Sequence, residues 1–382
     1  MRASVRNPEG AHAVVRLRSV VEDGIREGIF PGAVLLVSRA GRIVFLEAFG
    51  NRMVIPRAAP MGSQTVFDLA SLTKVFATTL AIMKLADSGR VELDQTLSEI
   101  IPSADLAQKK NLTPRLLLTH SSGLPAHRTY FIGLVEYPPH RRKAVVREWI
   151  VHEPFAYESG KGTLYSDLGF MLLEWVVETR TGTSLKEFVE NSFYVPLGLK
   201  STFFDTGGSP LSEDLQIAAT QYCPWRKRLL LGEVDDENAF ALGGYSGHAG
   251  LFSTAEEVWI LSEMLRGHYL GTRSDFFKPA TVREFFRRQD IVEGSDWALG
   301  WDTRAVEGSS AGSFFSRDSV GHTGFTGTSI WMDLEKDVTA IFFTNRVHPT
   351  RDNTEAFKAF RPRIHDAVMK DLVTGGTGRK KS

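Results

Sequence analysis

The sequence predicts an α+β protein in which an antiparallel sheet, built from both ends of the chain, is combined with an inserted, mostly helical segment. Two runs rich in β-branched and apolar residues, 33–37 and 42–49, lie near the start. Two more, 322–332 and 338–344, lie near the end, and the stretch from about 71 to 260 is helical and loop-rich. Because ligands bind in clefts between two such parts, we expect the functional site there.

Turn and cap residues mark the ends of these elements. An amphipathic helix ends near Gly28, and the turn 39–41 joins the first two strands as a hairpin. From Ser71 the apolar residues recur with a helical period as far as Gly89, which suits the position just past a helix C-terminus. The turn 333–337 joins the two late strands, so the strands come in two consecutive pairs.

Further helices are expected in the middle and at the end of the chain. The run 168–180 has a helical pattern closed by Gly182, and a short helix over 185–189 follows it. Another helix begins after Thr254, whose side chain suits an N-cap, and a last one covers about 354–373.

No internal repeat divides the chain. We therefore expect one domain over residues 1–373, with a sheet lobe formed by about 1–70 and 261–373 and a helical lobe formed by about 71–260. The last residues, 374–382, are basic and are expected to be disordered.

The charge balance argues against a nucleic-acid partner. Lys+Arg and Asp+Glu number 45 each, so no net field favours nucleic acid or an anionic membrane. The local basic clusters, 141–143 and 379–381, are short and lack interleaved aromatic residues. We expect a small-molecule, peptide or muropeptide substrate, and the sequence leaves the oligomeric state open.

The single cysteine, Cys223, excludes an intrachain disulfide. Arginines in the first 18 residues interrupt every apolar run before it reaches the length of a signal-peptide core. The best candidate for a spanning helix, 168–177, is too short and carries Glu174. We therefore expect a cytoplasmic protein without a membrane span.

The segment Ser71-Leu72-Thr73-Lys74 is an S-x-x-K sequence at the start of a periodic helix. Positions i and i+3 share one helix face, so the hydroxyl of Ser71 and the amine of Lys74 can meet. A lysine with a lowered pKa can take the proton of a serine and make it a nucleophile. The Ser71 N–H at the helix start is a possible oxyanion donor. The simpler alternative is an N-cap serine followed by a surface lysine.

Two other segments carry chemistry. Tyr165, in Tyr165-Ser166-Asp167, can relay a proton if it lies beside an ammonium, and Asp167 can hold Lys74 in place; the alternative is a loop tyrosine beside an aspartate N-cap. His322-Thr323-Gly324 opens a late strand, where Gly324 would let a substrate approach the strand edge. The N–H of Phe325 is a candidate second oxyanion donor. The alternative is a glycine-rich strand entering a bulge.

In this order, S-L-T-K, Y-S-D and H-T-G resemble the S-x-x-K, Y-x-N and K-T-G motifs of the serine β-lactamase and penicillin-binding-protein superfamily. The order is similar to that of the branch with class C β-lactamases and D-alanyl-D-alanine carboxypeptidases. The segments 116–125 and 250–255 fit the same pattern, and the resemblance runs from about Gly32 to Val373. It implies a β-lactamase/DD-peptidase-like fold with the active site between the sheet and the helical lobe.

The resemblance also implies the roles of the residues. Ser71 is the acylated nucleophile, Lys74 its base, and Tyr165 the relay to the leaving group. His322 stands at the K-T-G lysine position, and the N–H groups of Ser71 and Phe325 form the oxyanion hole. The segments 236–239 and 247–250 look like a subgroup of penicillin-binding protein 4B-like or muropeptide-processing hydrolases.

Two departures from the motifs change the expected chemistry. His322 replaces a lysine, so a fixed cation is lost or becomes pH-dependent. Asp167 replaces an asparagine, exchanging an amide for an acceptor-only carboxylate. This counter-charge can keep Lys74 protonated and shift the role of the base toward Tyr165.

Other candidates carry less weight. Ser310 lies in a G-x-S-x-G sequence, but no strand precedes it and no helical period follows it, so we expect a flexible loop. His248 could line the cleft or be a satisfied loop histidine. Thr323 and Gly324 are expected at the substrate, and Asn345 and Arg346 could hold a substrate carboxylate. No metal spacing or cofactor fingerprint is present, so we expect neither.

Three hypotheses follow. The first is an acyl-enzyme serine hydrolase acting on an ester or amide, as a carboxylesterase, a D-amino-acid peptidase or a muropeptide-type amidase. The second is a β-lactamase that uses the same machinery. The third is a non-catalytic penicillin-recognising or scaffold protein that keeps the fold.

Overall fold

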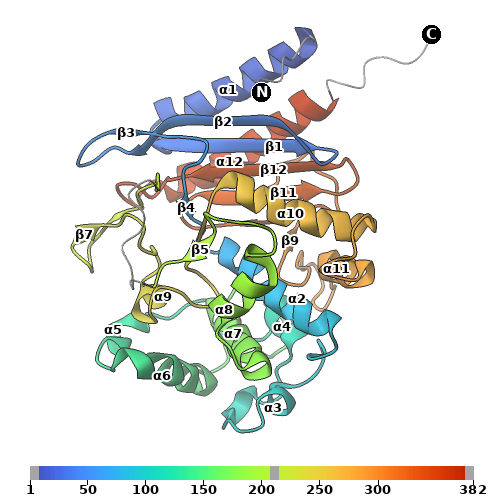
Figure 1. The fold of residues 1–382 in the computed structure, drawn as a ribbon. Helices are drawn as coiled ribbons and strands as arrows, with labels where there is room; N and C mark the ends of the chain where they lie inside the picture. The colour runs from blue at the N-terminus through green and yellow to red at the C-terminus, as the bar shows by residue number, and fades with distance from the viewer. Residues whose placement is uncertain (1–7, 207–214, 375–382) are drawn as a thin grey trace.

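A seven-stranded antiparallel sheet lies at one end of the molecule (Figure 1). The computed structural model describes residues 8–206 and 215–374. The strand order is β3-β2-β1-β12-β11-β10-β9, so strands from the two ends of the chain meet where β1 pairs with β12. The strands are β1 (Gly32–Arg39), β2 (Arg42–Met53), β3 (Ala59–Pro60), β9 (Asp302–Thr303), β10 (Val320–Thr323), β11 (Thr328–Asp333) and β12 (Val338–Thr344). The predicted α+β class is confirmed.

Helices cover both faces of this sheet, and β1 is therefore buried on both sides. Its residues Ala33, Leu35 and Val37 pack with apolar residues of α1 (Pro8–Arg26) and α12 (Thr354–Val368). The alternate residues, such as Val34, belong to the larger core that includes α10 (Ala255–Leu270). Figure 1 shows α1 and α12 on one side of the sheet and α10 on the other.

The prediction of a single late strand over 322–332 is wrong. The segment consists of two antiparallel strands, β10 and β11, in which His322 pairs with Ile330 and Thr323 with Ser329. The turn between them covers 324–327, where the Gly327 N–H bonds the Gly324 carbonyl and Gly327 has a φ of +113°. Two glycines three residues apart turn the chain back where the apolar pattern alone suggested one strand.

The expected turns and helix ends are otherwise confirmed. Ala40 and Gly41 both have positive φ in the first hairpin. Gly89 and Gly182 lie just past helix ends with φ of +71° and +75°, and the Thr254 side chain accepts from the Glu257 N–H as the N-cap of α10. The last helix ends at Val368 and continues as a π-helical segment, Met369–Thr374. Of the expected disordered tail, 375–382 lies outside the described residues.

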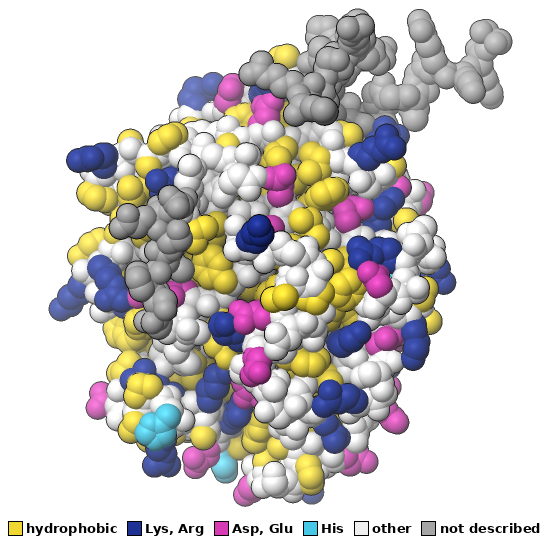
Figure 2. All heavy atoms as spheres, viewed as in Figure 1, with side chains coloured by type: hydrophobic (Ala, Val, Ile, Leu, Met, Phe, Trp, Pro, Cys, Tyr) yellow, Lys and Arg dark blue, Asp and Glu magenta, His cyan; other side chains and the backbone are white. Residues whose placement is uncertain are grey.

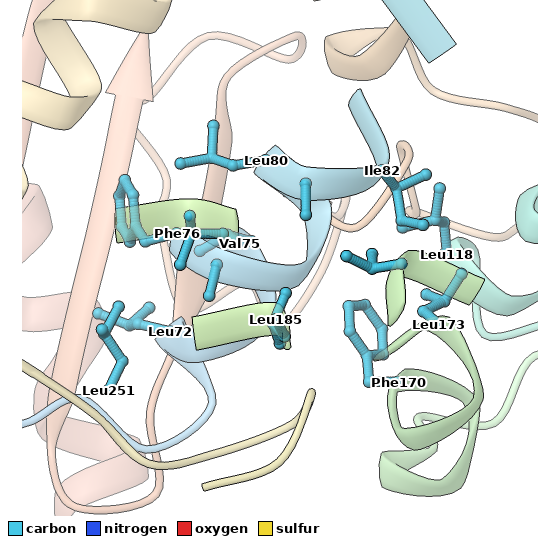
Figure 3. Packing of buried hydrophobic residues seen from close by; sticks show 14 of the residues in the cluster. Leu72, Val75, Phe76, Leu80, Ile82, Leu118, Phe170, Leu173, Leu185 and Leu251 are labelled. Carbon is cyan, nitrogen blue, oxygen red and sulfur yellow. The ribbon is translucent and has the colours of Figure 1, made fainter. Parts of the chain in front are cut away.

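The rest of the molecule is mostly helical and packs around the segment that follows Ser71. This segment continues as a π-helix, Lys74–Thr79, and then as α2 (Leu80–Asp87). Figure 3 shows its apolar side chains packed against those of the neighbouring helices, including Phe170 and Leu185. The other helices are α3 (Leu97–Ile100), α4 (Pro114–Leu118), α5 (Phe131–Leu134), α6 (Pro139–His152), α7 (Asp167–Thr181), α8 (Leu185–Val189), α9 (Glu237–Ala241) and α11 (Pro279–Phe286), with shorter segments Ala107–Lys109 and Glu190–Tyr194.

Two small sheets complete the fold. The first has the order β4-β8-β5 and places β4 directly before the Ser71 turn; its strands are β4 (Phe67–Asp68), β8 (Leu251–Ser253) and β5 (Phe203–Phe204). The second pairs β6 (Tyr222–Cys223) with β7 (Arg228–Leu229), and Cys223 is buried. Among the helices of the described ranges, none is long and apolar enough to cross a membrane. Figure 2 shows positive and negative side chains interspersed on the face in view.

Candidate active site

Ser71 lies in a tight turn between β4 and the central helical segment. The preceding Ala70 has a φ of +47°, a conformation that is unfavourable for a residue with a Cβ. The buried carboxylate of Asp68 accepts from the Ala70 N–H at 2.8 Å and from the Asp235 N–H at 2.7 Å. Thr326 donates its hydroxyl to the Asp68 carbonyl. Asp68 and Thr326 therefore hold the strained turn that presents Ser71.

Lys74 is fully buried and touches Ser71, as the i, i+3 spacing predicted. Its Nζ lies 3.1 Å from Ser71 Oγ, 2.7 Å from Asp167 Oδ1 and 3.2 Å from the His248 carbonyl. The first turn is not a regular α-helix, because Lys74 begins the π-helical segment. Such segments are frequent at functional sites. The contacts exclude the alternative of a surface lysine.

The charges of this pair support each other. Burial lowers the pKa of Lys74, but the carboxylate of Asp167 and the phenol of Tyr165 outweigh it, and the pKa is raised. Burial also raises the pKa of Asp167, while Lys74 and a hydrogen bond from His127 lower it more strongly, so its pKa falls. Lys74 is therefore an ammonium and Asp167 a carboxylate at neutral pH.

Tyr165 is positioned beside this pair. The Lys74 ammonium lies 4.8 Å from the centre of its ring. Its hydroxyl is buried and makes no hydrogen bond of normal geometry to the described residues. Burial raises the pKa of Tyr165, although Lys74 and Ser71 lie close enough to lower it in part. The hydroxyl is therefore protonated at rest.

The residue that caps the next helix is Ser166, not Asp167. The Ser166 side chain accepts from the Gly169 N–H, which leaves the Asp167 carboxylate available for Lys74. The Ser166 N–H in turn donates to His120 Nδ1 at 3.0 Å. The His120 ring packs on the Tyr165 ring with ring centres 4.5 Å apart, so His120 helps to fix the position of the tyrosine. Burial lowers the pKa of His120 well below its usual range.

His322 lies on the other side of Tyr165, with ring centres 6.0 Å apart. Its Nδ1 lies 3.0 Å from the Thr323 carbonyl, which fixes a tautomer with Nδ1–H as donor and Nε2 unprotonated. Burial and the positive charge of Lys74 lower the pKa of His322 to about 3. The expected loss of a fixed cation at this motif position is therefore complete at neutral pH.

Two backbone N–H groups are available for an oxyanion. Neither the Ser71 N–H nor the Phe325 N–H donates a hydrogen bond within the part of the chain that the structure describes. Gly324 was expected to leave room for a substrate, but the structure gives another reason for a glycine at this position. A Cβ there would lie 2.5 Å from the Leu69 carbonyl oxygen. The absent side chain lets the 324–327 turn pack on the strand that leads to Ser71.

Two cavities meet at Ser71, of about 330 Å³ and 480 Å³. Ser71, Tyr165 and Phe325 line both of them, and the Phe325 side chain is 45% exposed. The first, here named the acidic cavity, is also lined by Asp167, Asp235, Asp236, Glu237, His127, His248 and Arg351. The second, the basic cavity, is also lined by Trp297, Asp302, His322, Thr323, Gly324, Arg346 and Arg361.

In the acidic cavity, each of the four carboxylates has a positively charged or imidazole partner. Arg351 lies 2.7 Å from Asp235 and 3.1 Å from Glu237, and His248 Nε2 lies 3.0 Å from Asp236. The sequence did not decide whether His248 lines the cleft or is a satisfied loop histidine, and the structure places it in the acidic cavity. His127, Asp235, Glu237 and Arg351 had not been predicted as site residues, since they come from loops and a short helix with no shared motif.

In the basic cavity, two arginines contact only neutral groups among the described residues. Arg346 Nε donates to the Phe325 carbonyl and its Nη1 to the Thr354 hydroxyl, and Arg361 donates to the Gly324 and Thr328 carbonyls. Burial lowers the pKa of Arg346 to about 10 and that of Arg361 to about 9. Both remain cations at neutral pH and neither makes an ion pair with a carboxylate of the described residues, although Asp235 lies near enough to Arg346 to raise its pKa in part.

Two residues considered from the sequence lie away from the cavities. The buried Asn345 donates its amide to the carbonyls of Asn51 and Arg52, so it ties β12 to β2 and does not face a substrate. Ser310 Oγ is buried without a partner in the described residues, and its carbonyl accepts from His365. Within the described ranges, no group of His, Cys, Asp and Glu has the arrangement of a metal site.

Known proteins with the same architecture were found by sequence and by structure. The chain is 32% identical to an "N-acetylmuramyl-L-alanine amidase" of Bacillus subtilis over 87% of this chain and 81% of that protein. It is 33% identical to a "Putative D-alanyl-D-alanine carboxypeptidase" of Escherichia coli K12, over 84% and 79%. The solved structure of EstCE1, a hydrolase with promiscuous acyltransferase activity, matches with a TM-score of 0.73 and 21% identity, over 95% of this chain and all of that one.

A further solved structure, an octameric penicillin-binding protein homologue from Pyrococcus abyssi, matches with a TM-score of 0.71 and 21% identity, over 95% of this chain and 77% of that one. At these identities the two structures show that the fold is shared. The family model named Beta-lactamase matches residues 17–361. The chain therefore belongs to the β-lactamase family of serine hydrolases.

Proposed function

We propose that the chain hydrolyses an amide or ester through an acyl-enzyme on Ser71, and that its preferred leaving group carries a carboxylate. The contact between Lys74 Nζ and Ser71 Oγ, at the junction of an acidic and a basic cavity, carries this proposal. The nucleophile therefore lies where a substrate can occupy one cavity on each side of the bond that breaks.

The protonated Lys74 gives the first step a specific course. It donates to Ser71 Oγ and stabilises the negative charge that develops as Oγ attacks the carbonyl carbon. The Ser71 proton passes to the Tyr165 oxygen while the Tyr165 proton passes to the leaving nitrogen or oxygen, so Tyr165 stays neutral. The N–H groups of Ser71 and Phe325 stabilise the oxyanion. Water then cleaves the acyl-enzyme and releases the acid.

The basic cavity supports a substrate with an anionic leaving group. A buried cation without a directly paired carboxylate is costly, and neither Arg346 nor Arg361 contacts a carboxylate in the described residues. A carboxylate bound between them would compensate both charges. The names of the two relatives also point to amides of alanine, whose leaving group carries a carboxylate. A D-amino-acid peptidase or muropeptide-type amidase therefore fits better than an enzyme for simple esters.

A substrate panel tests the proposal. It contains a D-alanyl-D-alanine peptide, a muramyl-L-alanine compound, the C-terminally amidated forms of both, p-nitrophenyl acetate and nitrocefin. We expect at least one amide with a free carboxylate to have a kcat/KM about 10–100-fold above its amidated form, the value of a charged hydrogen bond.

Ser71→Ala should abolish turnover of every substrate, while Ser310→Ala should leave it unchanged. Equal rates for the free and amidated forms would remove the leaving-group assignment. Activity that survives Ser71→Ala would remove the mechanism itself.

A further inference from the structure

We propose that His127, oriented by Asp167, is the general base that activates water for hydrolysis of the acyl-enzyme, an inference that rests on the proposed acyl-enzyme function. His127 lines the acidic cavity together with Ser71, and its side chain is 47% exposed. Its Nδ1 lies 3.4 Å from Asp167 Oδ2, on the carboxylate whose other oxygen contacts Lys74. The Asp167 carboxylate thus contacts both the His127 imidazole and Lys74, the residue that contacts Ser71.

Hydrolysis of the acyl-enzyme needs a base that acylation does not. In acylation the leaving amine is itself basic and draws a proton through Tyr165. Water must instead give up a proton while it attacks, and the acyl-enzyme ester is a poor proton acceptor. Lys74 is an ammonium and the Tyr165 hydroxyl is protonated at rest, so neither can accept this proton directly.

The other imidazoles of the site are worse placed. His120 Nδ1 is occupied by the Ser166 N–H, and His322 Nε2 is buried against protein. His248 uses Nε2 to contact Asp236, and its Nδ1 is buried where water has no access. His127 Nε2 has no partner in the described ranges and belongs to an exposed ring. It is the imidazole at Ser71 that water can reach.

The orientation of His127 matches its role. Nδ1 faces Asp167 Oδ2 at 3.4 Å, so the carboxylate favours the tautomer with the proton on Nδ1 and the lone pair on Nε2, at the far side of the ring. In the step, Nε2 takes a proton from water as the water oxygen bonds to the acyl carbon. The bond from that carbon to Ser71 Oγ then breaks, and Oγ takes the Tyr165 proton while Tyr165 takes the second water proton from the new carboxyl group. The acid leaves as a carboxylate, and the His127 proton passes to solvent.

The charges around His127 raise the pKa of its imidazole. The groups that face it are Asp167 from α7 and Asp236 and Glu237 from the start of α9. The hydrogen bond to Asp167 raises the pKa of His127, burial opposes this, and the three carboxylates add to the rise. The imidazole is therefore a stronger base than His120 or His322, whose pKa values burial lowers. Hydrolysis of the acyl-enzyme should slow as pH falls through the His127 pKa.

Burst kinetics with p-nitrophenyl acetate separate the two steps. Release of p-nitrophenol in the burst reports acylation, and the steady state reports hydrolysis of the acetyl-enzyme. We expect His127→Ala and His127→Gln to keep the burst amplitude and to lower the steady-state rate by about 10²-fold, the low end of general-base catalysis. The acetylated protein should accumulate in intact mass spectra.

Two additions make the role specific. Hydroxylamine attacks esters without a base, so it should restore turnover in His127→Ala, and imidazole should restore it in part. The acidic limb of the steady-state pH profile should be lost in the variant. His152→Ala, at the exposed end of α6 where Nδ1 contacts the Glu148 carbonyl, is the matched control and should behave as wild type.

The outcomes are distinguishable. A wild-type steady state in both His127 variants, or loss of their burst, overturns the assignment of His127 and leaves the acyl-enzyme intact. Absence of any acetyl adduct in the wild type overturns the proposed function and this inference with it.

Discussion

Replacing Asp167 by asparagine probes the electrostatic centre of the site. The substitution keeps an oxygen acceptor for Lys74 Nζ but removes the carboxylate 2.7 Å away. Lys74 then remains fully buried without its counter-charge, because its other partners are the neutral Ser71 hydroxyl and His248 carbonyl. We expect the variant to be less stable at neutral pH and Lys74 to lose its proton.

The magnitude follows from the distance and the burial. Two unit charges 2.7 Å apart attract by roughly 6 kcal/mol at an effective dielectric constant near 20. Removing one partner of a buried ion pair costs about 3–5 kcal/mol in measured cases. We expect a loss of about 3 kcal/mol in the free energy of unfolding at pH 7, because the amide oxygen remains and Lys74 can deprotonate.

The sign of the pH dependence follows from the protons bound. In the variant the folded state holds a neutral Lys74, whereas the unfolded lysine binds a proton below a pKa of about 10.4. The variant therefore gains about 1.4 kcal/mol per pH unit above pH 7, relative to wild type, until the unfolded lysine titrates. In wild type Lys74 is protonated in both states over this range, so it contributes no slope.

Urea unfolding at pH 7 and pH 9 measures both effects. Asp94→Asn is the matched control, since Asp94 makes an ion pair of 2.8 Å with Arg115 but is 71% exposed. The control should cost at most about 1 kcal/mol. If Asp167→Asn costs no more than the control, and the cost is the same at pH 9, Asp167 does not hold Lys74 as an ammonium.

Three further predictions concern the walls of the site. The pKa of His322 is lowered to about 3, so the stability that comes with its neutral form is fully present above pH 6.5 and is lost as pH falls. In urea titrations between pH 6.5 and 4.5, wild type should lose about 2–3 kcal/mol more unfolding free energy than His322→Gln. Equal losses would exclude a neutral buried imidazole. Arg361→Met should lower kcat/KM about 10–100-fold for substrates with a free carboxylate and leave that for p-nitrophenyl acetate within a few-fold; an equal loss for both would mean that Arg361 acts only through the Gly324 carbonyl. Gly324→Ala should destabilise the protein by about 1–3 kcal/mol in urea unfolding, because the new methyl group meets the Leu69 carbonyl; wild-type stability and activity would refute the close approach.

The sequence predicted the parts of the site that depend on local geometry. Ser71 and Lys74 are three residues apart, and that spacing brings them together on one helix face. Asp167 was expected to hold Lys74, and the structure shows why it can: Ser166 takes the N-cap position and leaves the carboxylate free to point at the ammonium.

What could not be predicted depends on long-range packing. The acidic cavity joins His127, the segment 235–237 and Arg351, which are distant in the chain and share no period or motif. Asn345 was expected at the substrate because it ends a strand, but its amide is used by backbone carbonyls of β2 that only the folded sheet brings near. The late strand was misread because an apolar pattern does not report a glycine turn within it.

Covalent labelling tests the central claim most directly. The protein is quenched in acid during turnover of p-nitrophenyl acetate, and the acetyl group is located by peptide mass spectrometry. The proposed mechanism predicts an acetyl group on the peptide that contains Ser71, none in Ser71→Ala, and a loss of turnover of about 10⁴-fold or more in that variant. An acetyl group on another residue, or turnover by Ser71→Ala close to that of wild type, would contradict it.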